Sequence, residues 1–386
     1  MHELHLKNTK GERASNSDLT MMPPLDLKQC RHVDNIPLIH TLLYCLSLST
    51  FFVAALYIFV PTTIKQLPRD DVQHIKWRST IILIVMIIGI GVYPLLFCQS
   101  ISVGDEIIYP QWYRYLGFTW QPIQDVKIAI HVLRLYLGSF TCSCLKVYNH
   151  SRILHWEKEI RNKGQSIPRH LPPTQQLPII IKLQYLLQSF QYIWIQPTKH
   201  SFKSFLDDVE YRWIILRNLC IAPLVEEVIF RACLLPPLLV SITTKRNNRL
   251  TPTQSSWIAP LFFGIAHLHH FYEKYRQIPS RDRSNKVIGQ LVLVVAVQWT
   301  YTTLFGAYVS HIFIRTCSLL GITLAHILCN YMGLPNVSFT HPTSNLYGYF
   351  WFILIMYSVG IFGFVIGFDS VLFPKESVLV SLLNVN

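Results

Sequence analysis

Charged residues are scarce in this chain. Asp, Glu, Lys and Arg make up 14% of the 386 residues, whereas hydrophobic residues make up 51%. A soluble globular protein carries about 25% charged residues, so the composition excludes an ordinary soluble domain. The apolar residues lie in long runs, and several runs reach the ~20 residues that cross a bilayer. Because lipid offers no hydrogen-bond partners to the backbone, we expect these runs to be helices.

Motifs for several common chemistries are also missing. The nine cysteines are scattered and include no CxxC pair, so they support neither a zinc site nor a disulfide framework. No HExxH helix is present, and the nearest match, His2-Glu-Leu-His5, has the wrong spacing. GxSxG and glycine-rich phosphate loops are absent as well. The sequence therefore gives no support to a serine hydrolase or a nucleotide-binding protein, and we expect no cofactor.

The positive charge of the chain lies between its apolar runs. The net charge is +13, and the loop 273–286 alone carries five Lys or Arg residues. Membrane proteins place such residues next to anionic lipid headgroups, so we expect contact with a lipid bilayer and no binding of nucleic acid. No secretory signal precedes the first apolar run, and we expect that run to be an uncleaved anchor.

The apolar runs predict an all-α, polytopic membrane protein of about eight transmembrane helices. Nine candidate segments lie at 37–60, 79–99, 124–147, 177–196, 211–242, 255–270, 287–314, 316–334 and 347–368. The segment 255–270 is short for a transmembrane helix. The segment 211–242 contains three prolines, each of which can break a helix: Pro223, Pro236 and Pro237.

The same pattern divides the chain into four regions. We expect a polar, basic tail over 1–35 and membrane helices over 36–200, with a proline-rich linker at 157–178. A core with the polar motifs would occupy 201–335, and a last helix with its tail 336–386.

An acidic motif lies inside an apolar segment, in the run Glu226-Glu227-Val-Ile-Phe-Arg231. Ionisable groups in membrane helices are costly and are therefore candidates for function. Glu227 and Arg231 are four residues apart on one helix face, so they can form an ion pair. Glu226 points about 100° away and is left for another partner. Alternatively, both carboxylates pair with Arg231 and only join helices.

Two further motifs place polar residues in the apolar segments that follow. The first is Phe263-Gly-Ile-Ala-His267, with His270 on the same face as His267. The second is His326-Ile-Leu-Cys-Asn330, whose terminal residues share a face. Each His alone could be a satisfied core residue, but their joint occurrence favours one shared polar site.

A Glu, a His and a His–Asn face supply the groups that hydrolysis requires. A carboxylate in an apolar environment can act as a general base on water. A neighbouring His can orient that water, and an Asn amide with a second His can donate hydrogen bonds to an oxyanion. No serine nucleophile is needed.

The three motifs, EExxxR, FxxxH and HxxxN, occur in the order found in type II CAAX prenyl proteases. Residues 205–335 resemble this Ras-converting CAAX endopeptidase family of glutamate-dependent intramembrane proteases. The resemblance implies that Glu226 and His267 activate water and that His326 and Asn330 form the oxyanion hole. The residues that would support the site are Glu227, Arg231, Phe263 and His270.

The resemblance also implies a biological setting. The enzyme would lie in the endoplasmic reticulum membrane, with a catalytic cavity enclosed by the helices and an active site facing the cytosol. Its substrates would be prenylated CAAX proteins such as Ras-type small GTPases, from which it removes the last three residues. Two alternatives remain open: a zinc protease that uses Glu226, His267 and His326 as ligands, and a non-catalytic scaffold or transporter.

Overall fold

The computed structural model describes residues 31–32, 36–99, 101–103, 106–108, 112–162, 208–242, 249–267, 271–272, 275–276, 278–333, 335–371 and 377–383. Several expectations lie outside these residues. They are the apolar segment 177–196, His270, the linker beyond residue 162 and the tail before Arg31.

The described chain is helical, with two short strand pairs. The longer helices are α1 (Leu38–Ile58), α3 (Val72–Phe97), α4 (Pro122–Leu135), α5 (Leu137–Asn162), α11 (Pro252–His267), α13 (Asn285–Thr316), α14 (Leu319–Met332) and α15 (Phe350–Val371). The shorter helices are α2 (Thr62–Lys65), α8 (Val209–Leu216), α9 (Ala222–Glu227), α10 (Leu235–Val240) and α16 (Val378–Leu382). Two π-helical turns, η3 (Arg217–Ile221) and η4 (Val228–Ala232), flank α9.

The remaining elements are short. The 3₁₀ turns are η2 (Trp112–Arg114), η5 (Ser280–Asp282), η6 (Ser338–Thr340) and η7 (Tyr347–Tyr349). Strand β1 (Arg31–His32) pairs antiparallel with β2 (Cys98–Gln99), and β3 (Ile101–Val103) pairs antiparallel with β4 (Glu106–Ile108).

Four described helices are long and apolar enough to cross a bilayer. They are α1, α3, α13 and the helix Tyr347–Phe368, which overlaps α15. The helices α4 and α5, bent by 64° relative to each other, would make a fifth span as a pair. The expected polytopic helical protein is thus confirmed, with four to five candidate spans among the described residues, and the count of about eight stays a prediction. The difference between the two counts arises because 177–196 lies outside the described residues, because 211–242 turns at Cys233 and Leu234, and because α11 and α14 have 16 and 14 residues.

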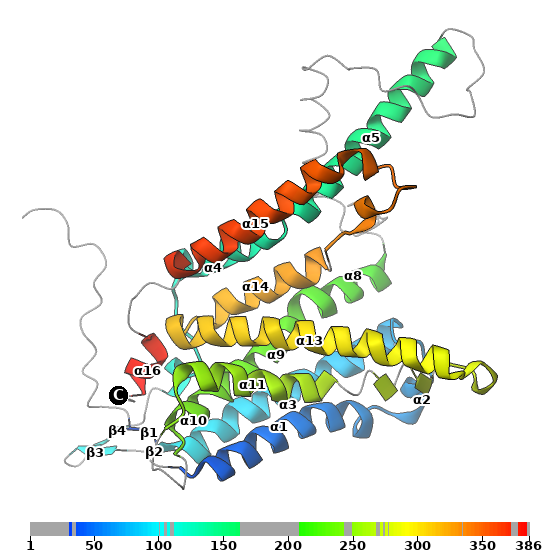
Figure 1. Ribbon diagram of the computed structural model, residues 1–386. Coiled ribbons are helices and arrows are strands. Elements are labelled where there is room, and N and C mark those ends of the chain that lie inside the picture. The colour runs from blue at the N-terminus through cyan, green and yellow to red at the C-terminus, as the bar shows by residue number, and fades with distance from the viewer. Residues whose placement is uncertain are drawn as a thin grey trace, which may run out of the picture.

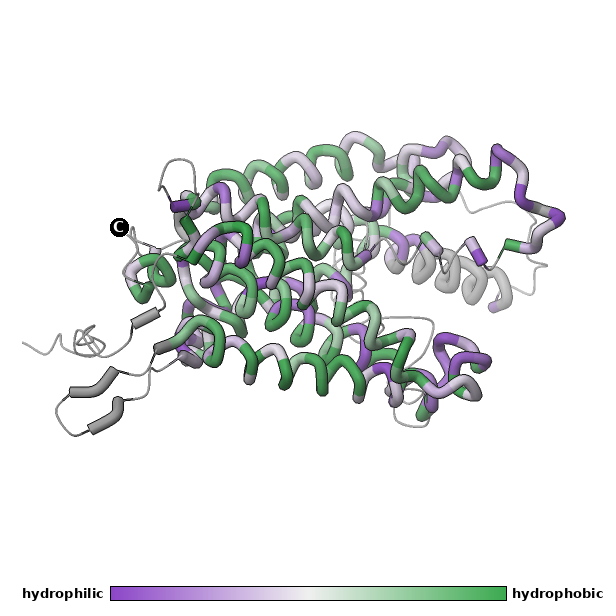
Figure 2. The backbone as a smooth tube through the Cα atoms, turned by 90° about the horizontal axis from the view of Figure 1, so that it is seen from below, coloured by the Kyte–Doolittle hydropathy of each residue, from purple (hydrophilic) through white to green (hydrophobic). Residues whose placement is uncertain are grey.

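The helices form one elongated bundle (Figure 1). In that view α1 and α3 lie at the bottom, α13 and α14 in the middle, and α4, α5 and α15 at the top. Helix α11 packs against α13, and α14 packs against α4. The tube in Figure 2 is largely hydrophobic along the middle of the bundle and hydrophilic near the loops. Large apolar side chains stay exposed on the outside, such as Trp351 at 72% and Phe362 at 67%. This pattern is typical of a surface that faces lipid.

A buried polar contact holds the start of α14 in place. The Ser318 side chain accepts a hydrogen bond from the Gly321 N–H at 2.9 Å and so caps the helix. The same hydroxyl donates to the carboxylate of Asp125 on α4, a residue that is 1% exposed. Because α14 carries His326 and Asn330, this contact positions two of the predicted site residues.

Candidate active site

The acidic motif lies on a helix that is widened rather than broken. Pro223 has no N–H, so it cannot donate to a carbonyl of the preceding turn. The N–H of Ala222 bonds to the Arg217 carbonyl, five residues back, and the helix continues through the π-helical turn η3 into α9. Of the three prolines that were expected to be able to break this segment, Pro223 thus widens the helix and does not break it. The segment turns at Cys233 and Leu234 instead, just before Pro236 in the first turn of α10.

Glu227 and Arg231 form the predicted ion pair. Arg231 Nη1 lies 3.2 Å from Glu227 Oε1, and both side chains are fully buried. The Arg231 guanidinium also lies 4.6 Å from the ring centroid of Phe263 on α11, in a cation–π arrangement. Gly306 on α13 leaves room for this group, since a Cβ there would lie 3.0 Å from Arg231 Nη2. The pair therefore holds three helical segments together.

His326 lies between the two glutamates. Its Nδ1 is 2.6 Å from Glu227 Oε1, the oxygen that also accepts from Arg231. Its Nε2 is 3.7 Å from Glu226 Oε2. Since a carboxylate only accepts, the short contact places a proton on Nδ1 and directs Nε2 toward Glu226. The partner that Glu226 was expected to have, other than Arg231, is thus His326.

His267 is oriented by its own helix. Its Nδ1 lies 2.8 Å from the carbonyl oxygen of Phe263, one turn earlier. A carbonyl accepts only, so Nδ1 carries the proton, and the lone pair of the neutral ring is on Nε2. The Phe263 ring packs edge-on against the imidazole, with the centroids 4.3 Å apart.

The Asn330 side chain donates a hydrogen bond to a backbone carbonyl that receives none from its own helix, because residue 223 is a proline. Its Nδ2 donates to the Asn218 carbonyl at 3.0 Å. In a π-helical turn that carbonyl would accept from the residue five positions on, which is Pro223. An amide nitrogen has two hydrogens, so Asn330 retains a second donor beside this bond.

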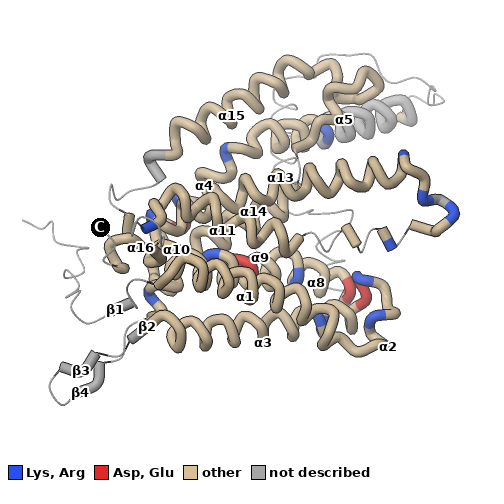
Figure 3. Tube along the Cα trace, turned by 60° about the horizontal axis from the view of Figure 1, so that its bottom comes forward, with Lys and Arg blue, Asp and Glu red and all other residues tan. Residues whose placement is uncertain are grey.

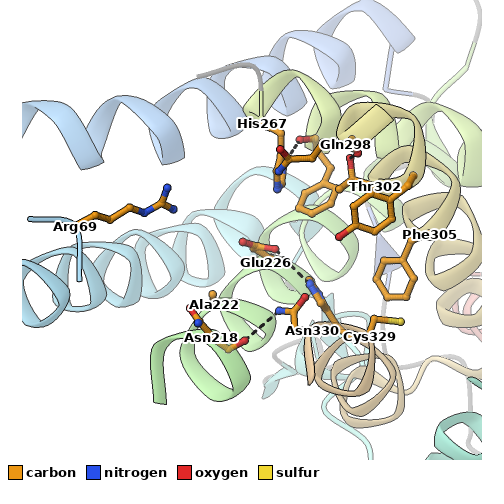
Figure 4. Close-up of a pocket in the computed structure, with 13 residues that line it drawn as sticks. Arg69, Asn218, Ala222, Glu226, His267, Gln298, Thr302, Phe305, Cys329 and Asn330 are labelled. Atoms are coloured by element: carbon orange, nitrogen blue, oxygen red, sulfur yellow. Dashed lines mark hydrogen bonds and ion pairs between the residues drawn. The ribbon is translucent and has the colours of Figure 1, made fainter. Parts of the chain in front are cut away.

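A pocket of about 390 Å³ brings the predicted catalytic residues together. Glu226, His267, His326 and Asn330 all line it. In Figure 4, Glu226 points into the space between His267 and Asn330. Phe263 also lines the pocket, whereas Glu227 and Arg231 lie behind its wall, fully buried. The Glu226 side chain is 20% exposed, so water can reach it.

Comparison with known proteins gives the family. Residues 208–332 match the family model described as Type II CAAX prenyl endopeptidase Rce1-like. A rat protein named CAAX prenyl protease 2 is 33% identical over 335 residues, which cover 86% of this chain and 79% of the rat protein. The chain belongs to the Rce1-like type II CAAX prenyl endopeptidase family. The predicted resemblance is confirmed.

Other members of this family match over shorter stretches. A human protein named CAAX prenyl protease 2 is 44% identical over 135 residues, or 34% of this chain. An Arabidopsis thaliana protein of the same name is 37% identical over 166 residues, or 43% of this chain. These two matches span 36% and 45% of the relatives' own lengths. No solved structure matches.

Some residues that line the pocket were not predicted from the sequence. One face of α13 lines it with Gln298, Tyr301, Thr302 and Phe305. The spacing i, i+3, i+4, i+7 places these residues on one face, and the polar pair Gln298 and Thr302 inside an apolar run was the available signal. Arg69, which precedes α3, also lines the pocket. Its loop contains other charged residues, and nothing in the sequence indicates that Arg69, rather than one of them, lines the pocket.

The zinc alternative requires three ligands close together. Among the described residues, no group of three or more His, Cys, Asp or Glu side chains is arranged to hold a metal ion. Two of the candidate ligands, Glu226 and His326, face each other at 3.7 Å. The third, His267, has its Nδ1 on the Phe263 carbonyl.

Proposed function

We propose that this protein is an endopeptidase that removes the C-terminal aaX tripeptide from farnesylated or geranylgeranylated CAAX proteins. One observation carries the proposal: Glu226, His267, His326 and Asn330 line a single pocket in a chain of the prenyl endopeptidase family. A carboxylate, two imidazoles and an amide around one water-accessible space are the groups that amide hydrolysis requires.

The reaction begins with a water molecule between Glu226 and His267. Glu226 takes a proton from the water while its oxygen attacks the carbonyl carbon of the prenylated cysteine. The carbonyl oxygen becomes an oxyanion, which accepts hydrogen bonds from Asn330 Nδ2 and from Nε2 of a protonated His326. The C–N bond then breaks, and the proton passes to the amine of the departing tripeptide.

Glu227 and Arg231 have a supporting role in this scheme. Glu227 orients His326 through the 2.6 Å contact, and Arg231 neutralises Glu227 in a fully buried position. This arrangement leaves Glu226 as the carboxylate that faces water.

The prenyl group explains why such a site lies in a membrane protein. The pocket wall includes the rings of Phe263, Tyr301 and Phe305. Residues on the outer side of α13 are apolar and exposed, such as Leu293 at 64%. An isoprenoid that stays against this surface buries up to ~15 carbons at ~0.8 kcal/mol each. That binding energy favours prenylated over unprenylated peptides by several powers of ten.

The cellular setting follows from the same proposal. The protein would lie in the endoplasmic reticulum membrane with the pocket open to the cytosol, where it would process Ras-type small GTPases. The bundle would reach about eight spans when the segment 177–196 and the helices of 208–267 are counted.

Purified protein in liposomes tests the activity. A farnesylated peptide ending in a CAAX sequence should lose its last three residues, as measured by mass spectrometry, while the unprenylated peptide should be cleaved at least ~10²-fold more slowly. A scaffold or transporter would cleave neither peptide. A zinc enzyme would lose activity in a strong chelator and regain it with added zinc, whereas the glutamate mechanism is insensitive to the chelator.

A further inference from the structure

We propose that Arg69 binds the C-terminal carboxylate of the substrate and thereby sets the position of the bond that is cleaved. The inference rests on the proposed function and adds the group that recognises the end of the peptide. Among the described residues that line the pocket, Arg69 is the single Lys or Arg. It comes from the loop between α2 and α3, far in the sequence from the motif residues.

The loop that carries Arg69 is fastened to the catalytic segment. Arg217 of η3 forms an ion pair with Asp70 at 3.0 Å, and its Nη1 donates to the Arg69 carbonyl at 3.3 Å. Asp71 caps α3 by accepting from the Gln73 N–H at 2.8 Å. The next residue of η3 is Asn218, whose carbonyl accepts from Asn330. Arg69 is therefore held at a fixed position relative to the proposed oxyanion hole.

The direction of the Arg69 side chain suits a peptide terminus. In Figure 4 the guanidinium extends from the α3 side toward the pocket, across from the catalytic residues. Figure 3 shows other charges gathered near α2 and α8, at one end of the bundle, whereas the acidic stretch of α9 lies inside it. Arg69 itself is exposed, so its guanidinium is accessible to a substrate that enters from water.

A substrate with a free C-terminal carboxylate calls for a cationic group in the pocket. The scissile carbonyl and the terminal carboxylate are separated by three residues, which span at most ~10 Å when extended. The terminal carboxylate repels Glu226, so it is driven to the side of the pocket that carries positive charge. Arg presents a planar fork that binds a carboxylate with two hydrogen bonds. With the prenyl group in lipid and the terminus on Arg69, the third bond from the end lies at Glu226.

The carboxylate contact is made equally in the ground state and the transition state, since the terminus does not react. Its loss should therefore raise KM and leave kcat nearly unchanged. We expect Arg69→Gln to raise KM about tenfold for a farnesylated peptide with a free C-terminus. A peptide with a C-terminal amide should bind the wild-type protein about tenfold more weakly than the free acid, and Arg69→Gln should not weaken it further.

The experiment compares the wild-type protein with Arg69→Gln, Arg69→Lys and Lys65→Gln, each in liposomes with both peptides. Arg69→Lys keeps the charge and should retain part of the preference for the free acid. Lys65 is an exposed cation of α2 outside the pocket, so Lys65→Gln should behave as wild type. Arg217 contacts the backbone carbonyl of residue 69, which the substitution keeps, and melting temperatures check that each variant is folded.

The assignment is overturned if Arg69→Gln changes KM for the acid and the amide by the same factor, or changes neither. In both cases the wild-type protein still cleaves, so the proposed function stands. A folded wild-type protein that cleaves neither prenylated peptide overturns the proposed function, and the Arg69 assignment with it.

Discussion

The Nδ1 atom of His326 lies 2.6 Å from Oε1 of Glu227, the same oxygen that accepts a hydrogen bond from Arg231. This carboxylate therefore connects α14 with the widened helix of the acidic motif. Glu226, one residue earlier, has no contact of this kind to Arg231 among the described ion pairs and lines the pocket. The two adjacent glutamates thus differ in burial and in partners, and we expect different consequences when each is replaced.

Replacing Glu226 by Gln should abolish turnover without unfolding the protein. Gln cannot accept the proton of the attacking water, so kcat should fall at least ~10²-fold. The side chain is partly exposed and its contact with His326 is long, at 3.7 Å, so the melting temperature should change little. Cleavage of a farnesylated peptide, normalised to folded protein, is the measurement. A variant with more than a few per cent of wild-type turnover would refute the assignment of Glu226 as the base.

Replacing Arg231 should lower stability as well as activity. The fully buried Glu227 would lose the guanidinium and keep only its contact with His326, and breaking a buried pair costs ~3–5 kcal/mol. We expect a lower melting temperature and a lower kcat in Arg231→Met, because His326 loses its support.

The double variant Glu227→Gln/Arg231→Met is the control for this prediction. It leaves no unpaired charge, so it should be more stable than Arg231→Met alone. If Arg231→Met keeps the wild-type melting temperature but is inactive, Arg231 acts on the substrate and not on the structure.

Replacing Asn330 by Ala should reduce kcat by ~10²–10³-fold with little change in KM, as expected for an oxyanion donor. Asn330→Asp should be at least as impaired, since a carboxylate repels the oxyanion. The structure adds a competing explanation, because Asn330 also satisfies the Asn218 carbonyl.

The variant Pro223→Ala separates the two explanations. It restores a backbone N–H that can bond to the Asn218 carbonyl. If Asn330 acts only through that carbonyl, Pro223→Ala should rescue Asn330→Ala. If Asn330 stabilises the oxyanion, the double variant should stay as slow as Asn330→Ala.

Replacing Ser318 by Ala should destabilise the protein and misplace α14. The change removes the helix cap, which costs ~1 kcal/mol, and takes a hydrogen bond from the buried Asp125 carboxylate, which costs ~1–3 kcal/mol more. We expect a lower melting temperature together with a reduced kcat. Ser284 caps α13 at an exposed position with a contact of 3.4 Å. Ser284→Ala is the matched control and should have a much smaller effect on both quantities.

The sequence predicted contacts within one helix better than contacts between helices. The ion pair of Glu227 and Arg231 follows from their spacing of four residues, and it is present. The contact of Glu227 with His326 spans 99 residues and depends on how α14 packs against α9, which no local pattern specifies. Pro223 signalled an irregular helix, but the donor that bonds to the freed Asn218 carbonyl, Asn330, lies 112 residues away, where no local pattern specifies it. The roles of the site residues and the four regions of the chain stay predictions.

The count of membrane spans shows a related limit. Apolar runs indicate which segments are buried in lipid or protein, but they do not distinguish a span from a short helix inside the bundle. The segment 211–242 reads as one long apolar run, whereas the structure divides it at the turn of Cys233 and Leu234.

The pocket joins two parts of the chain that lie far apart in the sequence. Of the thirteen described residues that line it, Arg69 alone lies outside the stretch 208–332 that matches the family model. The proposed catalytic residues and the residue proposed to bind the C-terminal carboxylate thus lie in separate segments of the sequence. Chimaeras in which residues 36–99 come from a relative without an Arg at position 69 should therefore lose the preference for a free C-terminal carboxylate over an amide, while kcat stays with the recipient.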